Sequence, residues 1–103
     1  MVSYPIVWTK KAIHDLQIHF SYLCEAVEHH EAKQMIQSIV NHVDVLETQP
    51  QIGQKEPYLL HLKRTYRRLI KEHYKIIYSF RNNKVYIHCI FDTRQNPKKM
   101  KIT

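Results

Sequence analysis

The sequence predicts an α+β domain in which an N-terminal strand and a two-helix hairpin pack on one face of a small twisted antiparallel sheet. Apolar residues recur every three or four positions in the first half of the chain, and every second position in much of the second half. A segment with two prolines and the only glycine separates the two patterns. At 103 residues, of which 44% are hydrophobic, the chain has the size and the core of a single domain, residues 1–103.

The N-terminal half predicts one strand and two helices. Residues 2–8 are apolar, β-branched and aromatic and predict a short strand, in which Pro5, which lacks an N–H, favours an edge position or a strand end. Thr9 is a suitable helix N-cap, and apolar stripes at helical spacing follow over residues 12–27 and 32–46. Helices average about 11–12 residues, so one helix covering both stripes would be unusually long. We therefore expect a turn within residues 25–30.

The C-terminal half predicts at least three antiparallel strands. The proline- and glycine-containing segment 49–57 is expected to be a loop, and residues 58–63 fit either a strand or a short helix. Strands are expected over residues 66–71, 74–80 and 85–91, with a tight turn at residues 81–84, where asparagines tolerate positive φ. Alternation places two sets of side chains on the core faces of the last two strands: Tyr74, Ile76, Tyr78 and Phe80, then Val85, Ile87, Cys89 and Phe91.

The two halves differ sharply in charge. Residues 1–54 carry three bases and six acids, whereas residues 55–103 carry thirteen bases and three acids and end in a basic tail, residues 97–103. This asymmetry suggests that a polyanionic partner, either nucleic acid or an acidic protein segment, meets the C-terminal half. A solubilising surface without a partner would give the same charge, so both interpretations stay open.

Composition argues against several functional classes. The two cysteines and eight histidines show no metal-ligand spacing, and a single glycine cannot build a nucleotide-binding loop, so we expect neither a metal nor a cofactor. Both cysteines fall on predicted core faces, where a buried thiol behaves as a small hydrophobe. No apolar run spans a membrane, and residues 1–11 do not resemble a signal peptide. We therefore expect a cytoplasmic protein that makes no membrane contact.

Basic and aromatic side chains gather on the predicted strands. Arginine grips phosphate oxygens with two donors, and tyrosine rings stack on unpaired bases, so such a cluster could serve a metal-free ribonuclease. Alternation turns Arg67 and Arg68 to opposite sheet faces, and one of them is expected to project away from the helices. The competing interpretation pairs an arginine with Glu72 or with a helix acid. The cluster comprises Arg64, Tyr66, Arg67, Arg68, Lys71, Tyr74, Lys75 and Arg94.

The ordered combination of these elements resembles the RelE/ParE superfamily of bacterial toxins. The resemblance rests on residues 66–78 (YRRLIKEHYKIIY) and 85–97 (VYIHCIFDTRQNP), joined by a polar turn. Upstream it includes Trp8, the Asp15–Leu16 pair and Gly53, so that it covers about residues 4–97. It implies the toxin of a type II toxin–antitoxin module, often called a plasmid stabilisation protein.

The resemblance leaves two targets open. RelE-like members cleave mRNA on the ribosome without a metal, whereas ParE-like members poison DNA gyrase and are not nucleases. In the first case Arg68, Lys75 and Arg94 would be catalytic, although Lys75 stands where that branch has an arginine, and no histidine or tyrosine follows Arg94. These departures, and the ending at residues 92–97, favour the ParE side. Whether the protein is an enzyme therefore stays open.

The resemblance also implies partners. A cognate acidic antitoxin would lie on the basic half, in a dimer or a heterotetramer with the toxin. Residues that would bind the target or its phosphates are Arg64, Arg67, Lys71 and Tyr74. A third hypothesis, from another class, is a non-toxic basic domain that binds nucleic acid, with an affinity that falls steeply with salt.

Overall fold

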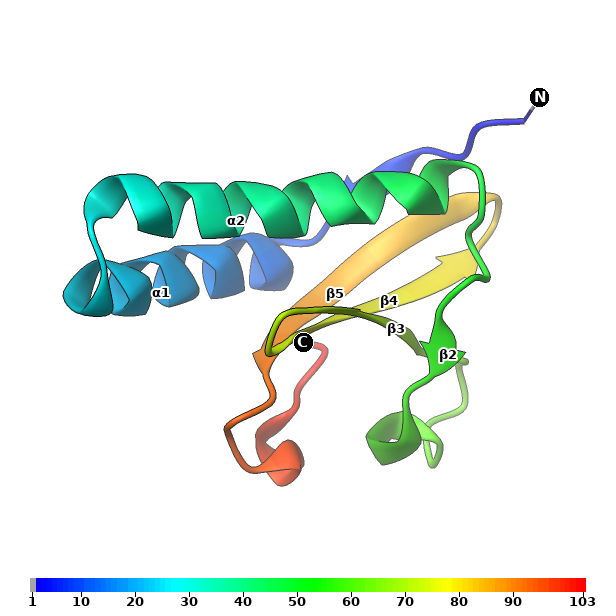
Figure 1. The fold of residues 1–103 in the computed structure, drawn as a ribbon. Helices are drawn as coiled ribbons and strands as arrows, with labels where there is room; N and C mark the ends of the chain where they lie inside the picture. The colour runs from blue at the N-terminus through cyan, green and yellow to red at the C-terminus, as the bar shows by residue number, and fades with distance from the viewer. Residues whose placement is uncertain (1) are drawn as a thin grey trace.

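The computed structural model describes residues 2–103; Met1, the first residue of the predicted domain, lies outside them. Two helices precede most of the strands, as Figure 1 shows. Within residues 2–103, neither helix is both long and apolar enough to cross a membrane. The elements in chain order are β1 (Ile6–Trp8), α1 (Lys10–Ala26), α2 (His29–Val43), a 3₁₀ turn (Asp44–Glu47), β2 (Gln54–Lys55), a second 3₁₀ turn (Pro57–Leu59), β3 (Arg67–Lys71), β4 (Tyr74–Arg81), β5 (Lys84–Asp92) and a third 3₁₀ turn (Pro97–Lys99).

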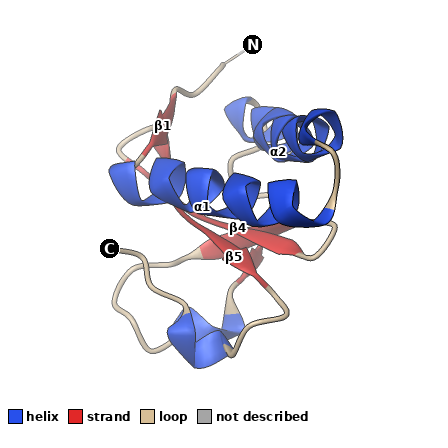
Figure 2. Cartoon of the chain, turned by 90° about the vertical axis from the view of Figure 1, so that its left-hand side faces the viewer, coloured by secondary structure: helices blue, strands red, loops and turns tan. Residues whose placement is uncertain are grey.

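The molecule has three layers, seen edge-on in Figure 2. Both helices cover one face of a five-stranded sheet of order β1-β5-β4-β3-β2, which confirms the predicted α+β class. The segment between β2 and β3 and the C-terminal segment lie against the other face. Strands β3 to β5 are antiparallel, as expected, and β2 joins them antiparallel to β3, but β1 runs parallel to β5, so the sheet is mixed.

The helical hairpin begins and turns where the sequence predicts. The hydroxyl of Thr9 accepts a hydrogen bond from the Ala12 N–H, which caps α1. The helices are separated by Val27 and Glu28, within the expected turn region. Ala12 and Ala32 are completely buried, and such small side chains let a helix approach its neighbours closely.

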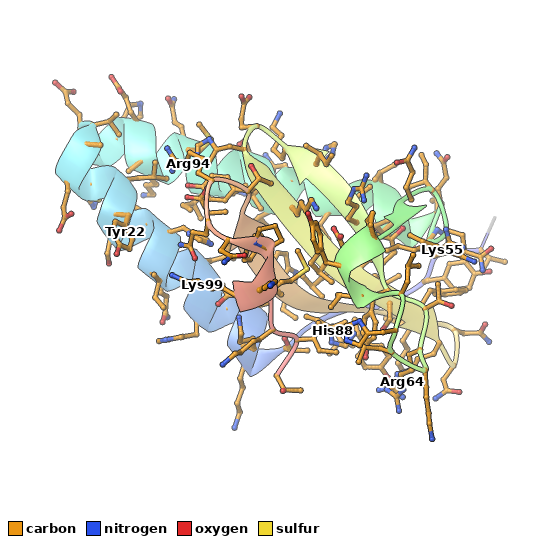
Figure 3. All side chains as sticks on the ribbon, turned by 90° about the horizontal axis from the view of Figure 1, so that it is seen from below. Tyr22, Lys55, Arg64, His88, Arg94 and Lys99 are labelled. Atoms are coloured by element: carbon orange, nitrogen blue, oxygen red, sulfur yellow. The ribbon has the colours of Figure 1, made fainter. Side chains whose placement is uncertain are left out.

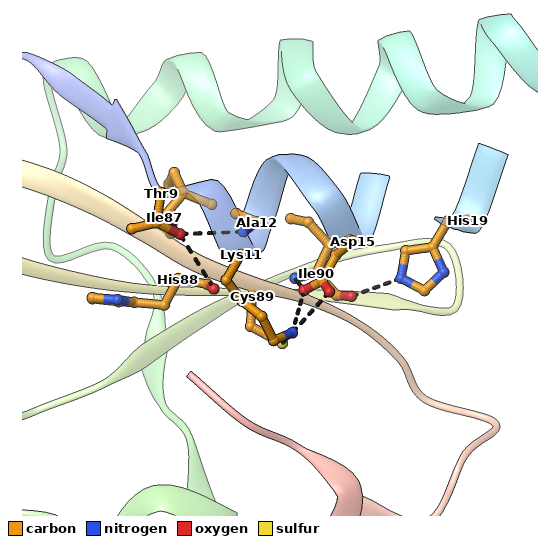
Figure 4. Close-up of polar contacts among 9 residues, drawn as sticks. All are labelled: Thr9, Lys11, Ala12, Asp15, His19, Ile87, His88, Cys89 and Ile90. Carbon is orange, nitrogen blue, oxygen red and sulfur yellow. Dashed lines mark hydrogen bonds and ion pairs between the residues drawn. The ribbon is translucent and has the colours of Figure 1, made fainter. Parts of the chain in front are cut away.

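Side chains of α1 continue the edge of β5 beyond the end of β1. The Ile90 N–H donates to Asp15 Oδ2 at 3.0 Å, and His19 Nε2 lies 2.7 Å from the Ile90 carbonyl oxygen (Figure 4). The Thr9 hydroxyl donates to the Ile87 carbonyl at 2.7 Å. Asp15 and His19 thus satisfy the two backbone groups of Ile90 that would otherwise be unpaired at the sheet edge. This helix–edge contact fixes α1 along β5.

The helix-side face of the sheet, here called the upper face, carries the main core. Tyr74, Ile76 and Tyr78 of β4 point into it, as the alternation predicts. The Tyr78 hydroxyl accepts a hydrogen bond from the Gly53 N–H at 2.9 Å. A Cβ at Gly53 would lie 2.6 Å from both that hydroxyl oxygen and the Arg68 carbonyl oxygen, so this close approach requires glycine. The other buried members of this core are Ala12, Ile39, Val43, Leu46, Val85, Ile87 and Ile90.

A β-bulge in β5 overturns part of the predicted alternation. Ile77 pairs with Cys89 and Tyr78 pairs with Ile87, which leaves His88 as an extra residue between them. Because His88 is inserted, Cys89 and Phe91 turn to the opposite face of the sheet and Ile90 enters the main core. The expectation that Cys89 and Phe91 share a face with Val85 and Ile87 is therefore wrong.

One further expectation needs correction, and one open alternative is decided in part for a short helix. Segment 49–57 is not entirely a loop, because its residues Gln54 and Lys55 pair with β3 as the short strand β2. Residues 58–63 form no strand; they continue the 3₁₀ turn that begins at Pro57 and then turn back toward β3. The tight turn before β5 is confirmed, with φ of 52° at Asn82 and 58° at Asn83.

Candidate functional site

The sheet face opposite the helices, here called the lower face, holds most of the residues that the sequence singled out. Two segments cover part of it: residues 57–66, and the C-terminal residues 97–102 (Figure 1). They pack on Ile77 and on the two residues that the bulge turns downward, Cys89 and Phe91. We call this group the lower cluster; its buried members are Leu59, Tyr66, Ile77, Cys89, Phe91 and Met100.

A buried carboxylate lies beside the basic residues of the lower face. Glu56 is fully buried, and Lys75 Nζ lies 2.8 Å from its Oε1. Arg68 Nη1 is 3.8 Å from the same oxygen. The Lys75 ammonium approaches outside hydrogen-bond geometry, so the contact is an ion pair without a directed hydrogen bond. The partner of Arg68 is thus neither Glu72 nor a helix acid, as one interpretation expected, but Glu56.

The backbone around Glu56 explains its burial. Its N–H donates to the Tyr66 carbonyl at 2.9 Å, and its Oε2 accepts from the Tyr58 N–H at 2.9 Å, where it caps the 3₁₀ turn. Lys75 Nζ also lies 5.4 Å from the Tyr58 ring centroid, in a cation–π contact. A buried charge is tolerated only when it is paired, so Glu56 holds Lys75 and Arg68 in place.

Arg94 is held by a different acid at the end of β5. Its Nε and Nη2 donate to the two carboxylate oxygens of Asp92 at 3.0 and 2.8 Å. The hydrogen bond from Arg94 lowers the pKa of Asp92, so this carboxylate stays charged. Arg94 remains largely exposed and therefore keeps part of its charge available at the surface.

The remaining predicted binding residues do not form one surface. Arg67 Nη1 donates to the Gly53 carbonyl at 2.8 Å. Tyr74 is only 1% exposed and packs between His19 and His73 in the main core, so its ring is not placed to stack on a base. Lys71 pairs in register with Tyr74 at the end of β3. Arg64 is exposed and lies at the opposite end of the lower face from Arg94 (Figure 3).

The lower face offers little for acid–base or nucleophilic catalysis. Burial raises the pKa of the Cys89 thiol to about 12, so it is not a nucleophile at neutral pH. Burial and the nearby arginines Arg81 and Arg64 lower the pKa of His88 to about 4. Among residues 2–103, no three His, Cys, Asp or Glu side chains are grouped closely enough to hold a metal ion.

Sequence reasoning missed three residues at the far end of the lower face. His88 is the extra residue of the bulge, which the sequence did not predict. Ser79 Oγ lies 2.7 Å from its Nε2. Arg81 lies over the Tyr86 ring, with Cζ 4.5 Å from the centroid. Glu56 was missed for another reason: its partners come from other strands, although an acid alone among bases could have indicated an ion pair.

Three comparisons with known proteins bear on this arrangement. The family model described as ParE toxin of type II toxin-antitoxin system, parDE, matches residues 6–97. Among solved structures, the chain is similar to one described as the chromosomal ParDE TA system from P. aeruginosa. The TM-score is 0.75 at 21% sequence identity, covering 87% of this chain and 96% of the other, which supports the fold. A comparison with curated proteins gave no match.

Proposed function

The chain belongs to the ParE toxin family of type II toxin–antitoxin systems, and from this premise we propose that it arrests growth by binding DNA gyrase. One observation carries the choice of target. Arg68 and Lys75, the residues that a nuclease of this superfamily would use on the scissile phosphate, are paired with the buried Glu56. Bringing a phosphate to them would break a buried ion pair, which is costly.

The alternative is a ribosome-dependent mRNA endonuclease that uses Arg68, Lys75 and Arg94. Such an enzyme needs a group that moves protons at the cleaved bond. His88 is buried and bonded to Ser79, and the thiol of Cys89 keeps its proton at neutral pH. If this alternative held, Arg68→Ala and Arg94→Ala would abolish both cleavage and toxicity.

Induced expression in cells separates the two targets. The linking number of a reporter plasmid and the rate of protein synthesis are followed in the same culture after induction. The proposal expects loss of negative supercoiling before protein synthesis falls, and retained toxicity in the Arg94→Ala variant. An immediate stop of protein synthesis with mRNA cleavage and unchanged plasmid topology would contradict it.

We further propose that an acidic antitoxin neutralises the toxin in the cytoplasm, in a heteromeric complex. Support comes from a groove of about 460 Å³ between residues 58–62 and 97–103. Apolar side chains line much of this groove, which is bordered by His61, Lys98 and Lys101. Tyr58 and Leu60 remain more than half exposed beside it. Apolar anchors with a basic rim suit an acidic segment that carries hydrophobic side chains.

Charge reversal tests this antitoxin surface. Lys98→Glu with Lys101→Glu should weaken binding of the co-expressed antitoxin about tenfold or more, measured by calorimetry. Lys10→Glu with Lys33→Glu is the matched control, because these exposed lysines lie on the helices. Equal losses in both variants would show that only net charge matters and would overturn the assignment.

A further inference from the structure

A second basic site lies at the end of the sheet opposite Arg94, where it runs from the lower face around the end of β3 and β4 to Arg67, the register partner of Tyr78. A pocket of about 260 Å³ is lined by Arg64, Thr65, Ser79, Phe80, Arg81 and Asn82. Two further pockets, of about 230 and 240 Å³, adjoin it through Arg64, Thr65 and Phe80 and add Lys55, Lys63 and Arg67. We call this surface the basic trough. In Figure 3 its labelled members Lys55 and Arg64 lie at the end where His88 lies, opposite Arg94 and Lys99.

The bases of the trough are not neutralised. Within residues 2–103, no carboxylate lies within 4.0 Å of Lys55, Lys63, Arg64, Arg67 or Arg81. In contrast, Glu56 pairs with Arg68 and Lys75, and Asp92 pairs with Arg94. The trough is therefore a part of the described surface where positive charge is concentrated without compensation.

Arg81 is positioned in advance for a ligand. The ring of Tyr86 supports its guanidinium at 4.5 Å, and this contact restricts a side chain that would otherwise sample many rotamers. Its Nε is buried and has no hydrogen-bond acceptor, which is costly for a donor unless a ligand supplies one.

Beside Arg81 the trough is lined by Ser79, which contacts the buried His88 beneath it. Ser79 and His88 are buried and joined by the 2.7 Å contact between Oγ and Nε2. Burial, Arg81 and Arg64 together keep the pKa of His88 at about 4, so the imidazole is uncharged at neutral pH. The Ser79 side of this pair lines the pocket beside Arg81. Arg81 and Arg64 are thus both close enough to His88 to lower its pKa.

We propose that the basic trough binds the phosphodiester backbone of a nucleic acid. Guanidinium groups match phosphate oxygens with two parallel donors, and the trough offers arginines from three different segments. Its extension over three adjoining pockets suits a polymer with regularly spaced charges better than a single anion. Around Arg67 and Arg81 the lining is charged or hydrogen-bonding except for Phe80, whereas the apolar side chains of the trough, among them Leu59 and Leu60, are confined to the third pocket. The proposal does not depend on gyrase being the target.

Fluorescence anisotropy of the purified full chain tests the proposal directly. The probes are a labelled single-stranded RNA of about 20 nucleotides, a DNA duplex of the same length, and a glutamate-rich peptide of similar charge, each titrated at several KCl concentrations. The trough variant is Arg64→Gln with Arg81→Gln. Its matched control is Lys10→Gln with Lys33→Gln, which removes the same charge from exposed positions on the helices.

We expect the wild-type protein to bind at least one nucleic acid, and the trough variant to bind it about tenfold or more weakly. The slope of log affinity against log salt should decrease by about 1.4 for the RNA or about 1.8 for the duplex, since two phosphate contacts are lost. The control should lose less than about threefold. Comparing the RNA with the duplex identifies the source of the phosphates.

Three results would overturn the proposal: no binding to either nucleic acid, an equal loss in the control, or equally tight and equally trough-dependent binding of the peptide. Replacing Arg81 also removes its packing on Tyr86 and could affect folding. Arg64→Gln alone is therefore a second variant, because Arg64 is exposed. It should give about half of the change in slope. An unchanged slope in this variant would also contradict the proposal.

Discussion

The two faces of the same sheet serve different purposes. On the upper face, β4 and β5 meet two helices through apolar side chains that are almost completely buried. On the lower face, the same strands carry a smaller apolar cluster, a buried ion pair and an uncompensated basic trough. More apolar surface is buried on the upper face, so folding free energy comes mainly from there, and the charged side chains that we propose for recognition lie elsewhere.

The largest change in stability is expected from a substitution in the main core, compared here with one in the lower cluster. Ile87→Ala removes a completely buried side chain between the sheet and the helices, and should lower the free energy of unfolding by about 2–5 kcal/mol. Met100→Ala, in the C-terminal segment, should cost less than half as much, because this segment can settle into the space left. Urea denaturation measures both; equal losses would show that the lower cluster contributes as much to stability as the main core.

The buried ion pair gives the next largest effect. Glu56→Gln removes the carboxylate that holds Lys75 and Arg68, and should lower the free energy of unfolding by about 3 kcal/mol. Adding Lys75→Met should recover part of this loss, because it removes the charge left unpaired. Glu72→Gln is the control, since Glu72 is exposed and forms no ion pair, and should change stability by less than about 0.5 kcal/mol. If Glu56→Gln behaves like this control, the ion pair does not organise the lower face.

His88 makes the stability of the lower face depend on pH. Its pKa of about 4 in the folded protein lies below the ordinary value of 6.5, so the unfolded chain takes up a proton first as pH falls. Stability should therefore fall by about 2–3 kcal/mol between pH 6.5 and pH 4. His88→Gln should flatten this interval, as seen by urea denaturation at several pH values. An equally steep decline in His88→Gln would assign the effect to other groups.

The helix–edge contact gives the smallest of these effects. Asp15→Ala leaves the Ile90 N–H without an acceptor and should cost about 1–3 kcal/mol. Asp15→Asn keeps an oxygen acceptor and should cost less, although it loses the ion pair with Lys11. Amide exchange at Ile90 provides the local readout. Unchanged exchange in Asp15→Ala would show that α1 does not protect the edge of β5.

Much of the fold could be predicted because its signals are local. The helical stripes, the Thr9 cap and the Asn82–Asn83 turn each depend on neighbouring residues, and the structure confirms them. The bulge at His88 could not be predicted, because one inserted residue changes the pairing with β4 without changing the composition of β5. Cys89 and Phe91, which follow it, were therefore assigned to the wrong face.

The candidate site was less predictable than the fold. The bases of the lower face stand out in the sequence, but which of them are neutralised depends on contacts between distant segments. Glu56 reaches Lys75 only because residues 57–66 fold beneath the sheet. Likewise, Arg64 and Arg81 belong to one pocket only after β4 and the segment before β3 have come together.

We propose that this ParE-family toxin acts on gyrase rather than on mRNA. The decisive experiment adds the purified protein to purified gyrase, ATP and relaxed plasmid, and in parallel to a translating ribosome extract. We expect supercoiling to fall as the toxin concentration rises, while mRNA in the extract stays intact. Unaffected supercoiling at excess toxin, together with cleavage of ribosome-bound mRNA, would contradict it.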